Sequence, residues 1–240
     1  MEAIIEACCK QLKIGRVFYQ EYKKIEADTH EAFLLELLKK EIEHRQIVRK
    51  NRLLKNANFD VIKTFNNYDF SELEIPSSLT LEDLKSASMI EKKENLIIYG
   101  GVGAGKTHLA TAIGVEACNQ GRKVRFYRTA ALVNQLTDAK AHGDLQKYMK
   151  QISQCDLLIC DEWGFIPFDK EGAQLLFQVI SECYERRSVI ITTNLKFSDW
   201  NTIFYDEIMT AAIIDRLIHH SHLILAKGLS KRFCSSTINC

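Results

Sequence analysis

Short apolar runs alternate with segments of helical periodicity from residue 95 towards the end of the chain. The apolar runs predict strands at 96–99, 124–128, 156–160, 188–193 and 222–226. The amphipathic segments between them predict helices at 106–119, 130–140, 171–186 and 207–219. Strands that alternate with helices are typical of a parallel sheet with helices on both faces. We therefore predict an α/β fold with a parallel five-stranded sheet, in which ligands bind at the carboxyl ends of the strands.

The first 55 residues show helical spacing without strands. One apolar stripe consists of Phe33, Leu34, Leu37, Leu38 and Ile42. The same helix becomes basic towards its end, with Lys39, Lys40, Arg45, Arg49, Lys50, Arg52 and Lys55. A basic helical face can neutralise the phosphates of duplex DNA. A solvated helix surface is the commoner meaning of such a charge run, and the sequence leaves both interpretations open.

Residues 56–94 connect these helices to the first strand of the sheet. They contain scattered aromatic residues, namely Phe59, Phe65, Tyr68 and Phe70. Exposed aromatic rings can stack on nucleic-acid bases. Packing is the more common role, so we expect this segment to form a strap on the following domain.

A glycine-rich loop follows the first strand. From Gly100 to Thr107 it matches the phosphate-loop pattern G-x-x-x-x-G-K-[ST]. Glycines let backbone N–H groups approach phosphate oxygens, and the following helix points its positive end at the same anion. Lys106 supplies a cation for the β- and γ-phosphates, and Thr107 a hydroxyl for Mg²⁺. The residues predicted to bind ATP are Gly100, Gly101, Val102, Gly103, Ala104, Gly105, Lys106, Thr107 and His108.

Two adjacent acids, Asp161 and Glu162, end the third strand. In the Walker B pattern, the first acid holds Mg²⁺, so we expect Asp161 to act with Thr107 as a metal ligand. Glu162 would polarise the attacking water. A kinase must keep water out, so this second acid favours ATP hydrolysis over phosphoryl transfer to a small molecule.

Two further candidates follow later elements. Asn194 ends the fourth strand and could hydrogen-bond the γ-phosphate or the water, although Asn is also a frequent turn residue. Arg216 lies near the end of the last helix and could reach the ATP site of a neighbouring subunit. The alternative for Arg216 is an interaction with the dipole of its own helix.

Composition narrows the remaining choices. The net charge of +1 does not indicate a nucleic-acid partner, so any basic patch must be local. The eight cysteines show no zinc spacing, and with no signal peptide they favour reduced thiols in a cytoplasmic protein. No apolar run approaches the roughly 18 residues of a membrane span. The three histidines His219, His220 and His222 are expected to be structural, because no other metal ligand converges on them in the sequence.

With these motifs in order, the chain resembles the IstB-like helper ATPases of bacterial insertion sequences, a branch of the AAA+ ATPases close to the helicase loaders. The most specific stretches are Asp161-Glu162-Trp163-Gly164 and Asp215-Arg216-Leu217-Ile218-His219-His220. The resemblance implies a P-loop NTPase fold of the AAA+ type, with ATP and Mg²⁺ as cofactors. It implies a helical N-terminal domain at 1–55, a connecting strap at 56–94 and an AAA+ ATPase domain at 95–240. By position, the catalytic residues would be Glu162, Lys106, Asn194 and Arg216.

The resemblance also implies partners. It predicts an ATP-dependent protein that binds duplex DNA, assembles into multimers and recruits or stimulates a transposase. The alternative is a replicative helicase loader, which would use the same ATP site on single-stranded DNA. The family commonly ends in Gly-x-Ser-aromatic-Arg, whereas Lys231 takes the aromatic position here. Arg232 is therefore only a candidate for sensing the nucleotide.

Overall fold

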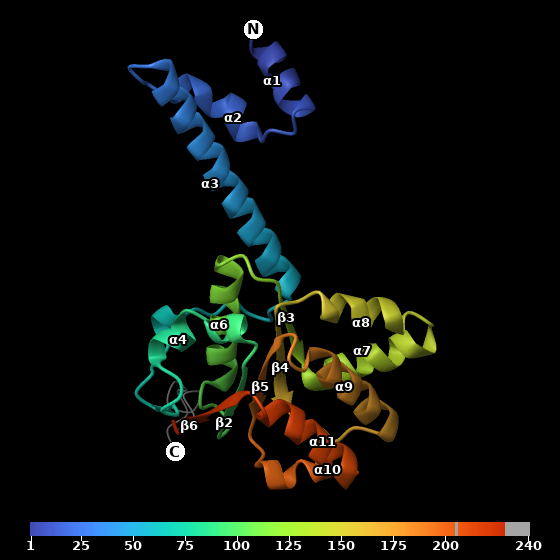
Figure 1. Ribbon diagram of the computed structural model, residues 1–240. Helices are drawn as coiled ribbons and strands as arrows, with labels where there is room; N and C mark the ends of the chain where they lie inside the picture. The colour runs from blue at the N-terminus through green and yellow to red at the C-terminus, as the bar shows by residue number, and fades with distance from the viewer. Residues whose placement is uncertain (205, 229–240) are drawn as a thin grey trace, which may run out of the picture. The chain divides into compact units, whose positions relative to one another are not determined.

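The computed structural model describes residues 1–204 and 206–228, so Arg232 lies outside the described residues (Figure 1). The chain divides into two compact units, Met1–Arg52 and Leu53–Cys240. The helix α3 (His30–Ala57) runs from the first unit into the second.

The first unit is helical. It contains α1 (Glu2–Gln11), α2 (Arg16–Glu21), the 3₁₀ turn η1 (Tyr22–Lys24) and most of α3. The carboxylate of Glu41 is buried, and it accepts hydrogen bonds from the backbone N–H of Gly15 at 2.7 Å and from Nε of Arg45 at 2.7 Å. The guanidinium of Arg45 also donates to the carbonyl of Lys13 at 2.9 Å. Arg45 therefore links two segments of this unit through hydrogen bonds, although 60% of its side chain is exposed.

The second unit begins with the strap and continues into alternating strands and helices. Its strands are β1 (Leu73–Glu74), β2 (Asn95–Gly100), β3 (Val124–Arg128), β4 (Leu157–Trp163), β5 (Ser188–Thr193) and β6 (Ser221–Ala226). Its helices are α4 (Leu81–Lys85), α5 (Met89–Lys92), α6 (Lys106–Asn119), α7 (Thr129–Ala141), α8 (Leu145–Ser153), α9 (Lys170–Cys183), α10 (Asn201–Phe204) and α11 (Glu207–Ile218). Two further 3₁₀ turns are η2 (Phe65–Asn67) and η3 (Phe197–Asp199).

The described strands form one sheet in the order β1-β6-β2-β5-β4-β3. All pairs are parallel except β1 with β6. The parallel α/β fold is thus confirmed, and each of the five predicted strands is present within three residues of its predicted limits. The sixth strand, β1, was not predicted, because two residues are too few to show an alternating pattern. The short helices α8 and α10 also escaped prediction, and α9 ends at Cys183 rather than at residue 186.

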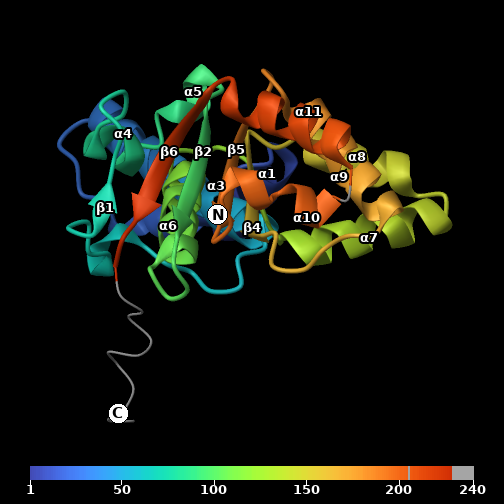
Figure 2. The same ribbon diagram turned by 90° about the horizontal axis from the view of Figure 1, so that it is seen from below.

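Alternate residues of the central strands face two separate hydrophobic cores. Leu157 and Ile159 belong to the core under α6, whereas Leu158 and Cys160 belong to the core under α7, α9 and α11. Figure 2 shows α7, α9 and α11 grouped on the side of the strands away from α4. The strap aromatics pack against the α6 core, as predicted: Phe59, Phe65, Tyr68 and Phe70.

No helix in the described part of the chain is both long and apolar enough to cross a membrane. The six cysteines there are free thiols, and five of them are buried. Burial raises the pKa of Cys118 to about 12, so its thiol stays protonated.

Asn95, at the amino end of β2, connects this strand to β5 and α11 by hydrogen bonds. Its buried side chain donates to the carbonyl of Leu217 at 3.2 Å and accepts from the N–H of Val189 at 2.9 Å. We expect Asn95→Leu to lower the free energy of unfolding by about 2–4 kcal/mol, because two buried backbone groups lose their partners. Urea unfolding measures this change. Asn119→Leu is the control, since Asn119 bonds only an exposed carboxylate at 3.1 Å, and equal losses in both variants would contradict the assignment.

Candidate nucleotide-binding site

The predicted site residues lie where three adjacent strands end. The sheet places β5 between β2 and β4, so the carboxyl ends of these strands are neighbours. The glycine-rich loop follows β2 and Asn194 follows β5. Asp161 and Glu162 lie near the carboxyl end of β4. The sequence predicted these positions at strand ends but could not predict which strands are adjacent.

The loop takes the conformation that its glycines allow. Gly103 and Gly105 have φ of 81° and 85°, a region that side chains with a Cβ rarely adopt. A Cβ on Gly105 would also lie 3.3 Å from the ring of Tyr68 in the strap. The helix α6 begins at Lys106, whose ammonium donates to the carbonyls of Gly100 at 2.8 Å and Gly101 at 2.7 Å. The amino group therefore lies at the loop where a phosphate would bind.

Asp161 joins the loop to β5. Its carboxylate is buried, and its two oxygens share a bifurcated hydrogen bond from Oγ1 of Thr107, at 2.9 and 3.1 Å. Oγ1 of Thr192 donates to the same carboxylate at 2.5 Å. The three side chains offer only oxygen atoms, which are the ligands that Mg²⁺ prefers. Thr107 and Asp161 thus fit the predicted magnesium site.

Glu162 has the opposite environment from its neighbour. A β-bulge between Cys160 and Trp163 interrupts the register with β5, and Glu162 takes a left-handed φ of 57°. Its N–H donates to Oγ1 of Thr192 at 3.0 Å, which fixes this turn. The exposed side chain lines a pocket of about 160 Å³ together with Lys106 and Asn194. The structure therefore brings the predicted base, the loop lysine and the predicted amide to one cavity.

A second pocket, of about 450 Å³, also borders the loop and shares Gly103, Lys106 and Thr107 with the first. It is lined by loop residues and by Asp60, Lys63 and Arg128, which the sequence analysis did not identify. Asp60 accepts a 2.8 Å hydrogen bond from Nε of Arg128, and this interaction raises the pKa of the Arg128 guanidinium. His108 lines this pocket, and its Nε2 lies 2.9 Å from the carbonyl of Thr64 in the strap.

Thr192 is the most important residue that the sequence analysis missed. It lies in a buried strand, and its hydroxyl contacts both Asp161 and the backbone of Glu162. The available signal was a polar pair, Thr192 and Thr193, at the end of an otherwise apolar strand. Thr129 adds a bond from its hydroxyl to the carbonyl of Asp161 at 2.8 Å.

Arg216 lies away from these two pockets. It is on α11, its guanidinium carbon lies 4.9 Å from the ring centre of Phe177, and it donates to the carbonyl of Ala212 at 2.9 Å. It lines neither pocket of its own chain. The structure thus does not bring Arg216 together with Lys106, Asp161 and Glu162.

Comparison with known proteins finds a family model and relatives that match the sequence, and solved structures that share the fold. The family model described as IstB-like ATP binding protein matches residues 17–237. The putative ATP-binding protein of insertion sequence IS5376 from Geobacillus stearothermophilus is 36% identical over 212 residues, which cover 88% of this chain and 84% of that protein. The corresponding IS21 protein from Pseudomonas aeruginosa is 33% identical over 233 residues, covering 95% and 88%. The DnaC helicase loader shares the fold, with a TM-score of 0.54 at 20% identity over 73% of this chain and 99% of that one.

The backbone of Glu162 is strained, and this strain should be measurable. Glu162→Gly is expected to raise the free energy of unfolding by about 1 kcal/mol, because glycine tolerates the left-handed conformation. Glu162→Gln keeps a Cβ and should leave the stability unchanged. Urea unfolding of the three proteins measures both values. A glycine variant no more stable than the glutamine variant would show that the turn is unstrained.

Proposed function

The chain belongs to the family of IstB-like ATP-binding proteins, a family of P-loop ATPases, and we propose that it is an ATP-dependent helper of DNA transposition. In this proposal it assembles on duplex DNA and recruits or stimulates a transposase. The observation that carries the proposal is the hydrogen-bonded set of Thr107, Asp161, Thr192 and Glu162 beside the phosphate loop. Both relatives, of which the chain covers 84% and 88%, are named for insertion sequences.

Each residue has a task in hydrolysis. The loop N–H groups and Lys106 bind the β- and γ-phosphates. Thr107 and Asp161 would hold Mg²⁺, which when bound neutralises charge on the phosphate oxygens. Glu162 takes a proton from the attacking water, and Asn194, in the same pocket, orients that water.

The rim of this pocket supports a site shared by two copies of the chain. Val102, Phe165 and Ile166 are large apolar residues, and 66%, 67% and 54% of their surfaces are exposed. Val102 and Phe165 line the pocket itself. Apolar surface of this kind beside a polar site is typical of protein interfaces. We infer that a second copy covers it and contributes its Arg216, which lies away from the pocket of its own chain.

A mixing experiment tests this shared site. Glu162→Gln and Arg216→Ala should each lower ATP turnover on DNA, by about 10²-fold or more for the base and about 10³-fold for the arginine. Mixed in equal amounts, the two variants should recover activity, because about a quarter of the junctions combine an intact Glu162 with an intact Arg216 in a random assembly. Phosphate release measures the recovery.

The control mixture pairs Glu162→Gln with Lys106→Ala. In the proposal, one subunit supplies both Glu162 and Lys106 to a given site. Every site in this mixture therefore lacks either Glu162 or Lys106. No recovery is expected there. Failure of the first mixture to exceed the second would exclude Arg216 as a residue supplied by a neighbour.

The basic end of α3 is the proposed contact with duplex DNA. Arg45 is bound to Glu41 and maintains the first unit, so it is a poor choice for testing. Lys50, Arg52 and Lys55 lie further along α3, and all three side chains are exposed. Three charges within two helical turns can contact neighbouring phosphates.

Replacing Lys50, Arg52 and Lys55 by Ala should weaken duplex binding and reduce the slope of log affinity against log salt by about 3. Fluorescence anisotropy over a salt series measures the slope. The matched control removes three exposed lysines elsewhere, at Lys92, Lys147 and Lys150. Equal slopes for both triple variants would exclude the end of α3 as the DNA contact, and tighter binding to single strands would favour a helicase loader.

A further inference from the structure

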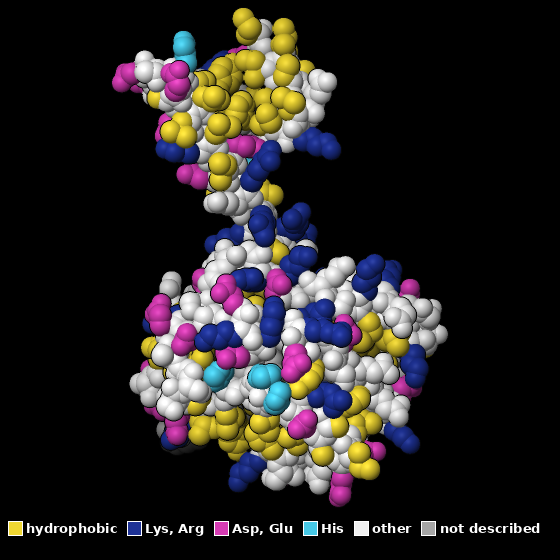
Figure 3. Space-filling view, in the orientation of Figure 1, with side chains coloured by type: hydrophobic (Ala, Val, Ile, Leu, Met, Phe, Trp, Pro, Cys, Tyr) yellow, Lys and Arg dark blue, Asp and Glu magenta, His cyan; other side chains and the backbone are white. Residues whose placement is uncertain are grey.

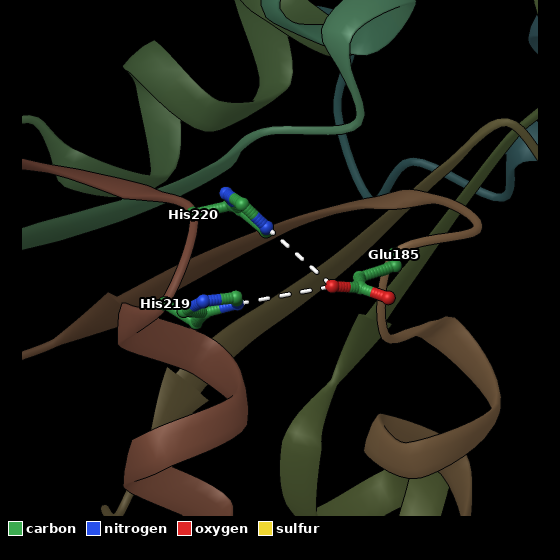
Figure 4. Close-up of side chains that lie close together, drawn as sticks. All are labelled: Glu185, His219 and His220. Atoms are coloured by element: carbon green, nitrogen blue, oxygen red, sulfur yellow. Dashed lines mark ion pairs between the residues drawn. The ribbon is translucent and has the colours of Figure 1, made fainter.

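A cluster of three metal-ligating side chains lies outside the nucleotide site. Glu185 follows α9, and His219 and His220 follow α11. One ligand atom from each lies within 4.8 Å of the other two. Figure 4 shows both imidazoles turned towards the Glu185 carboxylate, and Figure 3 shows histidine side chains gathered on this face of the second unit. All three residues are exposed, so the cluster is open to solvent.

The cluster occupies the end of the sheet opposite the phosphate loop. Its two segments lead into the amino ends of β5 and β6, whereas the ATP residues follow carboxyl ends. The backbone of the histidine segment is hydrogen-bonded to the sheet, because the N–H of Asn95 donates to the carbonyl of His220 at 2.6 Å. The Asn95 side chain also donates to the carbonyl of Leu217 in α11, the helix that precedes the histidines. The geometry of the cluster is therefore set by the sheet.

The distances suit a small transition-metal ion. Oε1 of Glu185 lies 3.6 Å from Nε2 of His220 and 3.9 Å from Nδ1 of His219. Ligand atoms at about 2.0–2.1 Å from a tetrahedral Zn²⁺ are about 3.3 Å apart. The two printed distances exceed this spacing by about 0.3 and 0.6 Å, and all three ligand atoms lie within 4.8 Å of one another, so small side-chain rotations would bring them to one ion. We propose that Glu185, His219 and His220 bind a divalent transition-metal ion of the zinc class.

The ligand chemistry separates this site from the Mg²⁺ site. Two imidazoles and one carboxylate favour Zn²⁺ over Mg²⁺, which prefers oxygen. Three protein ligands leave a fourth tetrahedral position for water or for a group from another molecule. Glu185 adopts a left-handed φ of 57°, and non-glycine residues in this conformation are concentrated at functional sites.

His222, which completes the group of three histidines in the sequence, is not a ligand. It lies between Oγ of Ser78 at 3.0 Å and the carboxylate of Glu94 at 3.1 Å, with only 11% of its side chain exposed. This is the structural role expected for all three. The sequence could not reveal the different role of His219 and His220, because Glu185 is more than thirty residues away.

Tyr184 provides a check on the ligand atom. Its hydroxyl lies 2.8 Å from Nδ1 of His219, the atom that faces Glu185. Metal binding at Nδ1 displaces this hydrogen bond. Tyr184→Phe should therefore bind the metal at least as tightly as the native protein, and a loss of affinity in this variant would overturn the assigned ligand set.

Isothermal titration of the full chain with Zn²⁺, without nucleotide, tests the site. We expect one ion bound per chain at the cluster, with affinity reduced by about 10-fold or more in Glu185→Gln and in His220→Gln. His222→Gln is the matched control and should bind like the native protein. Zn²⁺ should also raise the melting temperature of the native protein more than that of Glu185→Gln.

The cysteines are common to every variant, so zinc bound by thiols adds equally to all. Equal affinity and stoichiometry in the native protein and a Glu185→Gln/His220→Gln double variant would overturn the proposal. If the variants fail to fold, Co²⁺ in the native protein gives a second answer. Visible bands of tetrahedral cobalt without a thiolate charge-transfer band support the cluster, and a thiolate band as the only signal contradicts it.

Discussion

The buried carboxylate of Asp161 is the constraint on which the site depends. A buried charge is costly unless hydrogen bonds satisfy it. Here the donors come from Thr107 at the start of α6 and from Thr192 in β5. These bonds connect the carboxyl ends of three neighbouring strands, because β5 lies between β2 and β4. The sheet order thus brings together the oxygen atoms of the proposed Mg²⁺ site.

Thr192 gives two adjacent acids different environments. Its hydroxyl donates to Asp161 and accepts from the N–H of Glu162, so one side chain fixes both. The bulge then turns Glu162 outwards into the pocket while Asp161 stays inside. In the proposed roles, Asp161 as a metal ligand needs fixed geometry and Glu162 as a general base needs access to water. The left-handed backbone at Glu162 is the local cost of meeting both needs in consecutive residues.

Local features of this fold were predictable, and non-local ones were not. The phosphate loop, α6 and the strands carry their signals within a few residues, and α6 was predicted at its observed limits. Strand order, the pairing of β1 with β6 and the role of Thr192 depend on contacts between distant segments. The same reason explains Glu185, which no spacing connects to His219 and His220. The basic run on α3 was predicted as one surface, but the structure shows that Arg45, although exposed, is ion-paired with the buried Glu41.

The two proposed sites share elements although they lie at opposite ends of the sheet. The strand β5 begins at Ser188, three residues after Glu185. It ends at Thr193, next to Thr192 and directly before Asn194. The helix α11 carries Arg216, and His219 follows three residues later, about one turn along. A metal that links His219 and His220 to Glu185 would fix the last turn of α11 against the start of β5. On both proposals, the ion would restrict the segment that holds Arg216, and so would act on the arginine supplied to a neighbour rather than on the chain's own phosphate loop.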